Sequence, residues 1–196
     1  MTPLESFCQR WCKGCGSNQC RPGSKVVLGR GSIPCDILFV GEGPGEGENA
    51  TGVPFIGPAG KLLDQIIIRS IGAENRSRVA EGKQPLTWGL TNLVCCIPRD
   101  EEDGGKANEP DDDQIGACKP RLQEFVGLCQ PKLIVCVGRL AEDWLKPGYK
   151  WSIKFDRVIP LVRIDHPAYI LRQNIAQQGY MAQRAAVTVA NAVEDL

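Results

Sequence analysis

Short apolar runs alternate with longer amphipathic stretches along most of the chain. Four runs are rich in β-branched residues and end in Gly or polar residues, which is typical of buried parallel strands; they span residues 36–41, 87–92, 133–138 and 158–164. Apolar residues at helical spacing occupy residues 59–71, 111–129, 139–146 and 173–194. We therefore predict an α/β fold in which a doubly wound sheet of about four parallel strands lies between helices.

The composition indicates one folded domain, spanning residues 1–196. With 23 Lys and Arg against 23 Asp and Glu, the formal net charge is zero, which excludes a bulk polycation that coats nucleic acid. Residues 1–35 carry five basic residues and one acid, so they are the natural nucleic-acid-facing surface if the protein has one. No apolar run has the length of a membrane span or of a signal-peptide core, so we expect a cytoplasmic monomer without membrane contact.

Ten cysteines are many for 196 residues, and they favour metal or redox chemistry. Cytosolic thiols are kept reduced, so a disulfide framework is disfavoured. Cys12 and Cys15 form a C-x-x-C pair, which places two thiolates on one metal and needs two more ligands from the fold. Other candidate ligands are Cys8, Cys20, Cys95, Cys96 and Cys118. Three more are interpreted as small apolar core residues: Cys35, Cys129 and Cys136.

Polar side chains follow three of the four predicted strands. A Gly-rich loop after the first strand carries Glu42, Glu48 and Phe55. Asn92 ends the second strand, and His166 follows the fourth. The loop spacing fits neither common phosphate-binding motif, and its carboxylates would repel a triphosphate. A strand-end Asn or a lone His is often structural, but the carboxyl ends of parallel strands converge on one crevice, so we predict a ligand site there.

An acidic segment separates the second predicted strand from the helix at residues 111–129. Residues 100–113 contain eight acids and one Lys, which is typical of a solvated loop that leads into a helix N-terminus. We interpret this segment as a surface insertion.

Three sequence blocks resemble the signature blocks of family 4 uracil-DNA glycosylases, the iron-sulfur branch of that superfamily. The blocks are GEGPGEGENATGVPFIGPAGKLLD, TNLVCCIPRD followed by Asn108-Glu109-Pro110, and HPAYILR. The resemblance extends over nearly the whole chain, from the C-x-x-C pair to the His block. It implies a three-layer α/β/α sandwich around a four-stranded, mainly parallel sheet, with an N-terminal cysteine-rich segment that binds a [4Fe-4S] cluster. It also implies a base excision repair enzyme that hydrolyses the N-glycosidic bond of uracil in single- or double-stranded DNA and leaves an abasic site. We expect it to be monofunctional, because no Lys in the three blocks stands at a position suited to Schiff-base chemistry.

The resemblance assigns four cysteines to the cluster. Cys95 stands where the family usually has another residue, and the offset from Asn92 selects Cys96 instead. The implied ligands are Cys12, Cys15, Cys96 and Cys118.

The chemistry of uracil suggests a role for each strand-end residue. Asn92 would match uracil O4 and N3–H at once and reject cytosine, in which both groups are reversed. Phe55 would stack on the flipped base. His166 would donate a hydrogen bond to uracil O2 as the leaving base gains negative charge. Glu42 is the first choice for the carboxylate that orients water, with Glu48 second.

Other residues of the blocks are assigned to the base and to DNA. Glu48 would occupy the space near C5 and exclude thymine, and Gly43 would line the base pocket. Leu171 would wedge into the vacated stack and Arg172 would meet a phosphate, or both are ordinary helix residues. Gly43 stands where the family commonly has Ala, and Asn49 where it commonly has Asp, which predicts an altered pocket.

Three alternative functions stay open at this point. One is a glycosylase for another modified pyrimidine, which would keep Phe55 and His166. Another is a non-catalytic iron-sulfur DNA-binding domain, which the presence of Glu42, Asn92 and His166 disfavours. The third is a zinc protein of unrelated function.

Overall fold

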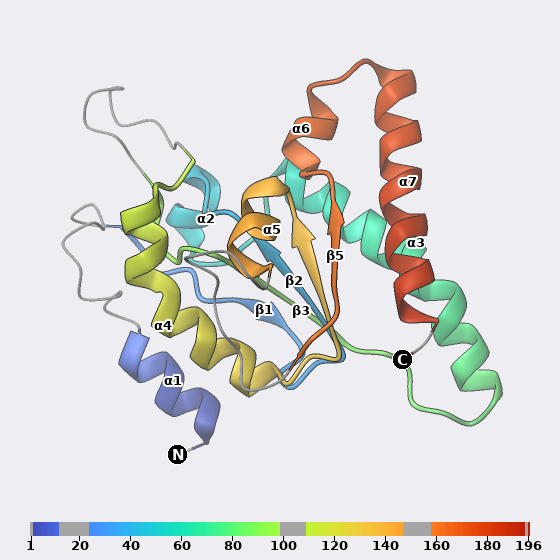
Figure 1. Ribbon diagram of the computed structural model, residues 1–196, viewed down its shortest axis with the longest axis horizontal. Coiled ribbons are helices and arrows are strands. Elements are labelled where there is room, and N and C mark those ends of the chain that lie inside the picture. The colour runs from blue at the N-terminus through green and yellow to red at the C-terminus, as the bar shows by residue number, and fades with distance from the viewer. Residues whose placement is uncertain (1, 12–23, 99–108, 147–157, 195) are drawn as a thin grey trace.

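The centre of the computed structural model is a twisted sheet between two layers of helices (Figure 1). The structure describes residues 2–11, 24–98, 109–146, 158–194 and 196. Within these residues the sheet has five strands: β1 (Arg30–Gly31), β2 (Ile37–Gly41), β3 (Trp88–Asn92), β4 (Leu133–Val137) and β5 (Leu161–Ile164). The order is β1-β3-β2-β4-β5; β2 to β5 are parallel where they pair, and β1 is antiparallel to β3.

The four predicted strands are confirmed, and β1 adds a fifth that the four-strand prediction did not include. Its pairing with β3 sets Arg30 against Leu90 and Gly31 against Gly89. Gly31 has a φ of +100°, and a Cβ there would lie 2.5 Å from the Trp88 carbonyl oxygen, so the pairing requires glycine. Two residues are too few to show strand periodicity, which is why the pattern did not predict β1.

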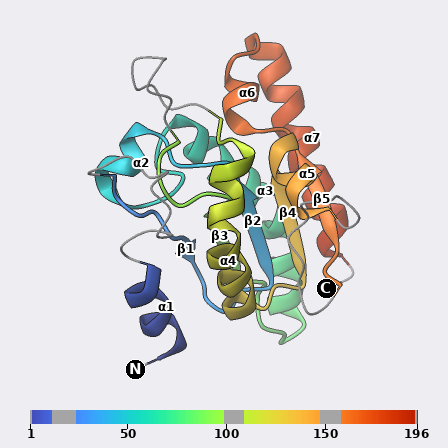
Figure 2. The ribbon, with the colours of Figure 1, turned by 60° about the vertical axis from the view of Figure 1, so that its left-hand side comes forward.

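Seven helices occupy the described residues: α1 (Pro3–Trp11), α2 (Glu46–Thr51), α3 (Pro58–Ala80), α4 (Asp112–Cys129), α5 (Arg139–Leu145), α6 (Pro167–Leu171) and α7 (Ile175–Val193). Helices α3, α6 and α7 cover one face of the sheet, and α1, α4 and α5 lie on the other (Figures 1 and 2). The predicted three-layer sandwich is therefore confirmed. None of the helices in the described part of the chain has the length and apolar character that a bilayer span requires.

Helix α3 ends at Ala80 rather than at the predicted residue 71. Its buried residues stop at Ile71, and polar contacts hold the second half. The Asn75 amide donates to the Leu86 carbonyl at 3.1 Å and accepts from the Leu86 N–H at 2.7 Å. Such contacts leave no apolar period in the sequence, so the prediction stopped too early.

Helix α4 begins where the acidic segment ends, as predicted. Asp111 is its N-cap and accepts from the Gln114 N–H at 2.7 Å, while Gln114 Oε1 accepts from the Asp111 N–H at 3.2 Å. This reciprocal capping box fixes the helix start. Residues 100–108 of the segment lie outside the described residues.

Each face of the sheet has its own core. In β2, Ile37 and Phe39 join the core under α3 and α7, while Leu38 and Val40 join the core under α4 and α5, because successive strand residues point to opposite faces. The cysteines expected in the core are buried on the second face, as predicted: Cys35, Cys129 and Cys136.

Candidate active site

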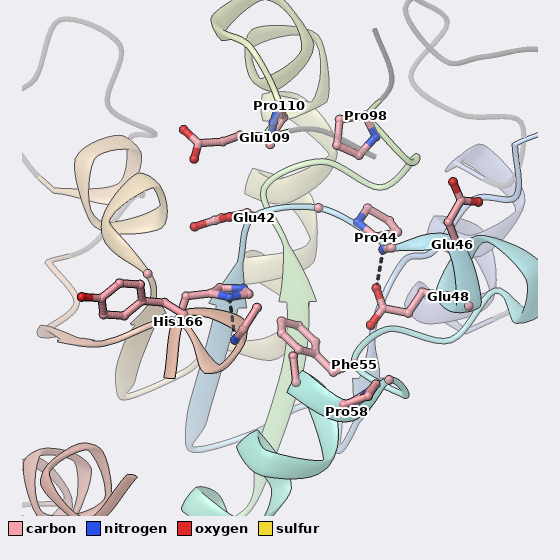
Figure 3. Close-up of a pocket in the computed structure, with 18 of the residues that line it drawn as sticks. Glu42, Pro44, Glu46, Glu48, Phe55, Pro58, Pro98, Glu109, Pro110 and His166 are labelled. Atoms are coloured by element: carbon pink, nitrogen blue, oxygen red, sulfur yellow. Dashed lines mark hydrogen bonds between the residues drawn. The ribbon is translucent and has the colours of Figure 1, made fainter. Parts of the chain in front are cut away.

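A cavity of about 1010 Å³ opens at the carboxyl edge of the parallel strands (Figure 3). Its walls come from the segments directly after β2, β4 and β5, from the start of α3, and from Pro98 and Glu109. The structure brings Glu42, Phe55 and His166 together in these walls, whereas Asn92 is not among the described residues that line the cavity. Glu109 is an additional carboxylate of the cavity to which the sequence analysis gave no role.

Asn92, the last residue of β3, is buried, with 1% of its surface exposed. Neither its amide nitrogen nor its amide oxygen has a hydrogen-bond partner within the described residues. A Cβ on Gly41 would lie 2.6 Å from Asn92 Oδ1 and 2.4 Å from Phe55 Cζ, so the glycine lets the amide and the ring approach one another. An unpaired buried polar group costs about 1–3 kcal/mol, so this amide suits a ligand that offers both a donor and an acceptor.

Phe55 has a φ of +57°, a strained left-handed conformation for an aromatic residue. Arg30 stabilises it, because Arg30 Nε donates to the Pro54 carbonyl at 2.9 Å and Nη2 donates to the Phe55 carbonyl at 3.2 Å. The same guanidinium pairs with Asp64 on α3 at 2.6 Å. A Cβ on Gly60 would lie 1.8 Å from the Phe55 carbonyl oxygen, so α3 reaches this turn only through glycine. The sequence analysis missed these partners because they come from β1 and α3.

His166 is the N-cap of α6, and its Nδ1 accepts from the Ala168 N–H at 3.2 Å (Figure 3). The imidazole proton is therefore on Nε2 in the neutral ring. Burial, aided by the positive charge of Arg172, lowers the pKa of His166 to about 4. At neutral pH this side chain is a neutral hydrogen-bond donor.

Glu42 follows β2 and shares one corner of the cavity with His166. Burial, aided by the charge of Glu109, raises the pKa of Glu42 to about 7, although Arg172 acts in the opposite direction. A Cβ on Gly138 would lie 2.6 Å from Glu42 Oε1 and 3.3 Å from His166 Cβ. Gly138 thus leaves room for the carboxylate beside the imidazole. Its position at the end of the predicted strand 133–138 could have indicated that it belongs to the site, but the sequence analysis gave it no role.

Glu48 lies in α2, a short helix inside the stretch that the sequence analysis treated as a loop. Its Oε2 accepts from the Gly45 N–H at 2.6 Å, which holds the carboxylate in the cavity wall. Gly43 also lines the cavity, and a Cβ there would lie 2.9 Å from Val94 Cγ2 and 3.2 Å from Pro98 Cδ. The tight contact explains why glycine, and not alanine, suits this chain at position 43.

Asn49 does not line the cavity in the described residues. Its Oδ1 accepts from the Lys25 N–H at 2.9 Å and ties α2 to the segment before β1. Asn49 therefore helps to position α2, which carries Glu48 in the cavity wall, but does not line the cavity itself.

Leu171 and Arg172 lie at the end of α6. Leu171 is 37% exposed and does not line the cavity. Arg172 lines the cavity, and its guanidinium lies over the Tyr169 ring at 6.0 Å from the centroid. The structure thus places a cation at the cavity rim and an exposed apolar side chain beside it.

Three buried cysteines gather between the end of β3 and α4. Cys95 Sγ lies 3.8 Å from Cys118 Sγ and 3.9 Å from Cys96 Sγ, so Cys95 contacts both predicted ligands. Cys12 and Cys15 lie outside the described residues. Within the described residues no group of three or more His, Cys, Asp or Glu could hold a metal ion, so a metal centre here depends on ligands from elsewhere in the chain.

The surroundings favour the thiolate form at Cys95 but not at Cys118, whose pKa is raised by its hydrogen bond with Cys95 and by burial. Hydrogen bonds with Cys118 and Cys96 lower the pKa of Cys95. Arg121 on α4 is fully buried and interacts electrostatically with Cys95 and Cys118. Thiolates are the usual ligands of iron-sulfur clusters and of structural zinc. The donor set therefore fits the [4Fe-4S] group that the resemblance implies.

The sequence profile described as the uracil DNA glycosylase superfamily matches residues 28–190. The match covers the whole sheet and every segment that lines the cavity.

Several curated proteins are similar to this chain, and each is called type-4 uracil-DNA glycosylase. The protein of Sulfurisphaera tokodaii is 40% identical over 143 residues, which are 72% of this chain and 57% of that protein. The protein of Saccharolobus solfataricus is 34% identical over 120 residues, 61% of this chain and 48% of that protein. The protein of Thermotoga maritima is 31% identical over 157 residues, 76% of this chain and 73% of that protein. The chain thus spans about half the length of the first two relatives.

A solved structure supports the fold. The crystal structure of wild-type SMUG2 from Pedobacter heparinus matches with a TM-score of 0.54 and 17% sequence identity, over 99% of this chain and 83% of that one.

Proposed function

Because this chain belongs to the uracil-DNA glycosylase superfamily, we propose that it hydrolyses the N-glycosidic bond of uracil in DNA and leaves an abasic site. The observation that carries the proposal is the buried Asn92 amide, which lacks a partner within the described residues. Its relatives named type-4 uracil-DNA glycosylase support the same activity.

Asn92 selects the base. Its amide nitrogen donates to uracil O4 and its amide oxygen accepts from uracil N3–H, so uracil satisfies both atoms. Cytosine presents a donor and an acceptor in the reverse order and leaves both pairs unmatched, at about 1–3 kcal/mol for each buried group. Phe55 stacks on the base after the base leaves the DNA helix. The hydrogen bonds from Arg30 to the Pro54 and Phe55 carbonyls hold the backbone that carries this ring.

His166 and Glu42 act on the bond that breaks. The bond between the base nitrogen and the sugar carbon breaks with its electron pair on the base, and negative charge develops at uracil O2. The Nε2–H of neutral His166 stabilises that oxygen, and such a donor in a dry site contributes about 3–4 kcal/mol. The Glu42 carboxylate orients the water whose oxygen bonds to the sugar carbon, and its raised pKa suits a group that accepts the proton of this water.

The remaining residues set selectivity and contact DNA. Glu48 fills the space near C5 of the base and excludes the methyl group of thymine, and Gly43 lets the loop after β2 lie against Pro98. Leu171 enters the stack that the flipped base vacates, and Arg172 binds a phosphate.

A [4Fe-4S] cluster would be held by Cys12, Cys15, Cys96 and Cys118. When bound, it would add to the stability of the folded chain, because only the fold brings its ligands together. We further propose that residues 1–196 form one domain with a cysteine-rich N-terminal segment, and that the protein is cytoplasmic and monomeric.

The test uses purified protein and single-stranded oligonucleotides that each contain one uracil, thymine, cytosine or 5-hydroxymethyluracil. Alkali cleaves any abasic site, and a gel reports the product. We expect cleavage at uracil only and no covalent adduct on borohydride treatment. Cleavage at 5-hydroxymethyluracil but not uracil would assign another pyrimidine, and no cleavage by protein that contains its cluster would reduce the chain to a DNA-binding domain.

A further inference from the structure

Arg121 on α4 is completely buried, with 0% of its surface exposed. Within the described residues no carboxylate lies at ion-pair distance from its guanidinium. Removing an unpaired charge from water costs several kcal/mol, so a buried cation normally has an anion beside it.

The hydrogen bonds of Arg121 all run to the end of β3. Nη1 donates to Thr91 Oγ1 at 2.9 Å, and Nη2 donates to the Asn92 carbonyl at 2.6 Å and to the Leu93 carbonyl at 2.9 Å. Nε has no partner within the described residues. These acceptors are neutral, so they orient the guanidinium and fix the backbone of Asn92, but they do not balance its charge.

The anion that could balance it lies among the cysteines. Cys118 comes one helical turn before Arg121 on α4, and Cys95 follows the clamped end of β3. Arg121 donates to the Leu93 carbonyl, two residues before Cys95, and the sulfurs of Cys95 and Cys118 are 3.8 Å apart. Thiolates that bind a metal stay deprotonated, so a thiolate-bound cluster supplies lasting negative charge at this place.

We propose that Arg121 is the internal counter-ion of the cluster and, through the same guanidinium, the residue that positions Asn92 for base recognition. The inference rests on the proposed function, because it assumes that Asn92 at the end of β3 binds the base. In this inference the Arg121 side chain connects that residue to the metal centre. Arg121 is a positioning residue, since it reaches the base through the backbone of Asn92.

The test compares three variants of the cluster-loaded protein. Arg121→Met removes the charge and the donors at similar length, and Arg121→Lys keeps the charge but loses the forked donor geometry. Arg69→Met removes one positive charge from an exposed position of α3 and is the matched control. The midpoint potential of the cluster comes from a redox titration followed by electron paramagnetic resonance, and kcat and KM come from the uracil oligonucleotide assay.

We expect Arg121→Met to shift the potential to more negative values, because a lost positive charge disfavours reduction of an anionic centre. We also expect its kcat to fall by about tenfold or more with KM little changed, as for other losses of active-site positioning. Arg121→Lys should keep a potential near that of the unmodified chain and still lose kcat. A Met variant whose potential, kcat and preference for uracil over cytosine all match the Arg69→Met control would overturn the proposal.

Two further outcomes are decisive. If Arg121→Met does not fold, Arg121→Lys decides: a reduced kcat at unchanged potential supports the clamp, and an unchanged kcat contradicts it. If the unmodified protein releases no uracil, the proposed function fails, while the potential of the variants still shows whether Arg121 balances the cluster charge.

Discussion

The sheet lies between two layers of helices (Figure 2), and its two faces share the same strands but bury different chemistry. The core under α3, α6 and α7 consists of aliphatic and aromatic side chains such as Leu63 and Ile66, with no cysteine among the described residues. The core under α1, α4 and α5 contains six buried cysteines, and Arg121 of α4 is buried beside them. The first core is thus apolar, whereas the second also buries thiols and lies beside a buried cation.

The candidate site draws on both faces. Phe55 belongs to the apolar core, which holds the stacking ring, and the backbone of Asn92 is held by Arg121 from the cysteine side. We therefore expect substitutions on the two faces to affect the candidate site for different reasons. Changes to the apolar face should lower stability, and changes to the cysteine face should remove the metal.

The largest effect should follow Cys118→Ser on the cysteine face. Serine is a poor ligand for iron, so we expect the purified protein to lose nearly all of its iron and its brown chromophore. Cys136→Ser is the control, because Cys136 is buried on the same face inside β4 and is not a predicted ligand. Iron analysis and absorbance measure both, and equal iron in the two variants would remove Cys118 from the ligand set.

Removal of the donor at the shared edge comes next. His166→Asn keeps an N-cap side chain for α6 but lacks the Nε2–H, so kcat should fall about 10²- to 10³-fold with little loss of stability. His166→Ala should lose a similar factor in kcat and, in addition, about 1 kcal/mol of stability with its N-cap. Single-turnover kinetics and urea denaturation separate the two effects, and full activity in the Asn variant would exclude His166 from the chemical step.

On the apolar face, Leu63→Ala should cost about 3 kcal/mol of unfolding free energy, because it opens a cavity under α3. The iron content should stay unchanged, since Leu63 lies in the core without cysteines. Urea denaturation and iron analysis of the same preparation give both numbers. Loss of iron in this variant would show that the two faces are not independent.

A smaller effect is expected from pH. In the proposed mechanism the carboxylate form of Glu42 is the active one, so with a pKa of about 7 the activity should rise as the pH rises through 7 and fall about tenfold per unit well below it. His166 stays neutral over this range because its pKa is lowered to about 4. The profile of kcat/KM against pH tests this, because kcat/KM reports the groups of the free enzyme, with Glu42→Gln as the control that should be slow and flat. A profile without a step near pH 7 would mean that a group other than Glu42 orients the water and accepts its proton.

The sequence predicted the parallel strands because each is a continuous apolar run, and strand order then implied that Glu42, Asn92 and His166 share one edge. The resemblance supplied uracil as the substrate, and the chemistry of uracil then suggested the roles of these residues. The same reasoning did not predict β1, because its two residues depend on glycine contacts with β3.

Residues that act through distant contacts were also missed. Arg30 reaches Phe55 from β1, and Arg121 reaches Asn92 from α4, so neither has a local motif. Gly138 has meaning only beside Glu42 and His166, which come from other strands. Positions of this kind need the fold before their function can be inferred.

The central claim is that the buried Asn92 amide reads uracil. The most direct measurement is the single-turnover rate of the unmodified protein and of Asn92→Ala on two single-stranded oligonucleotides that differ only in one uracil or cytosine. We expect the unmodified protein to cleave only at uracil, and Asn92→Ala to be at least about 100-fold slower at uracil and less selective, with its fold and iron retained. An Asn92→Ala variant that removes uracil at the unmodified rate would contradict the account.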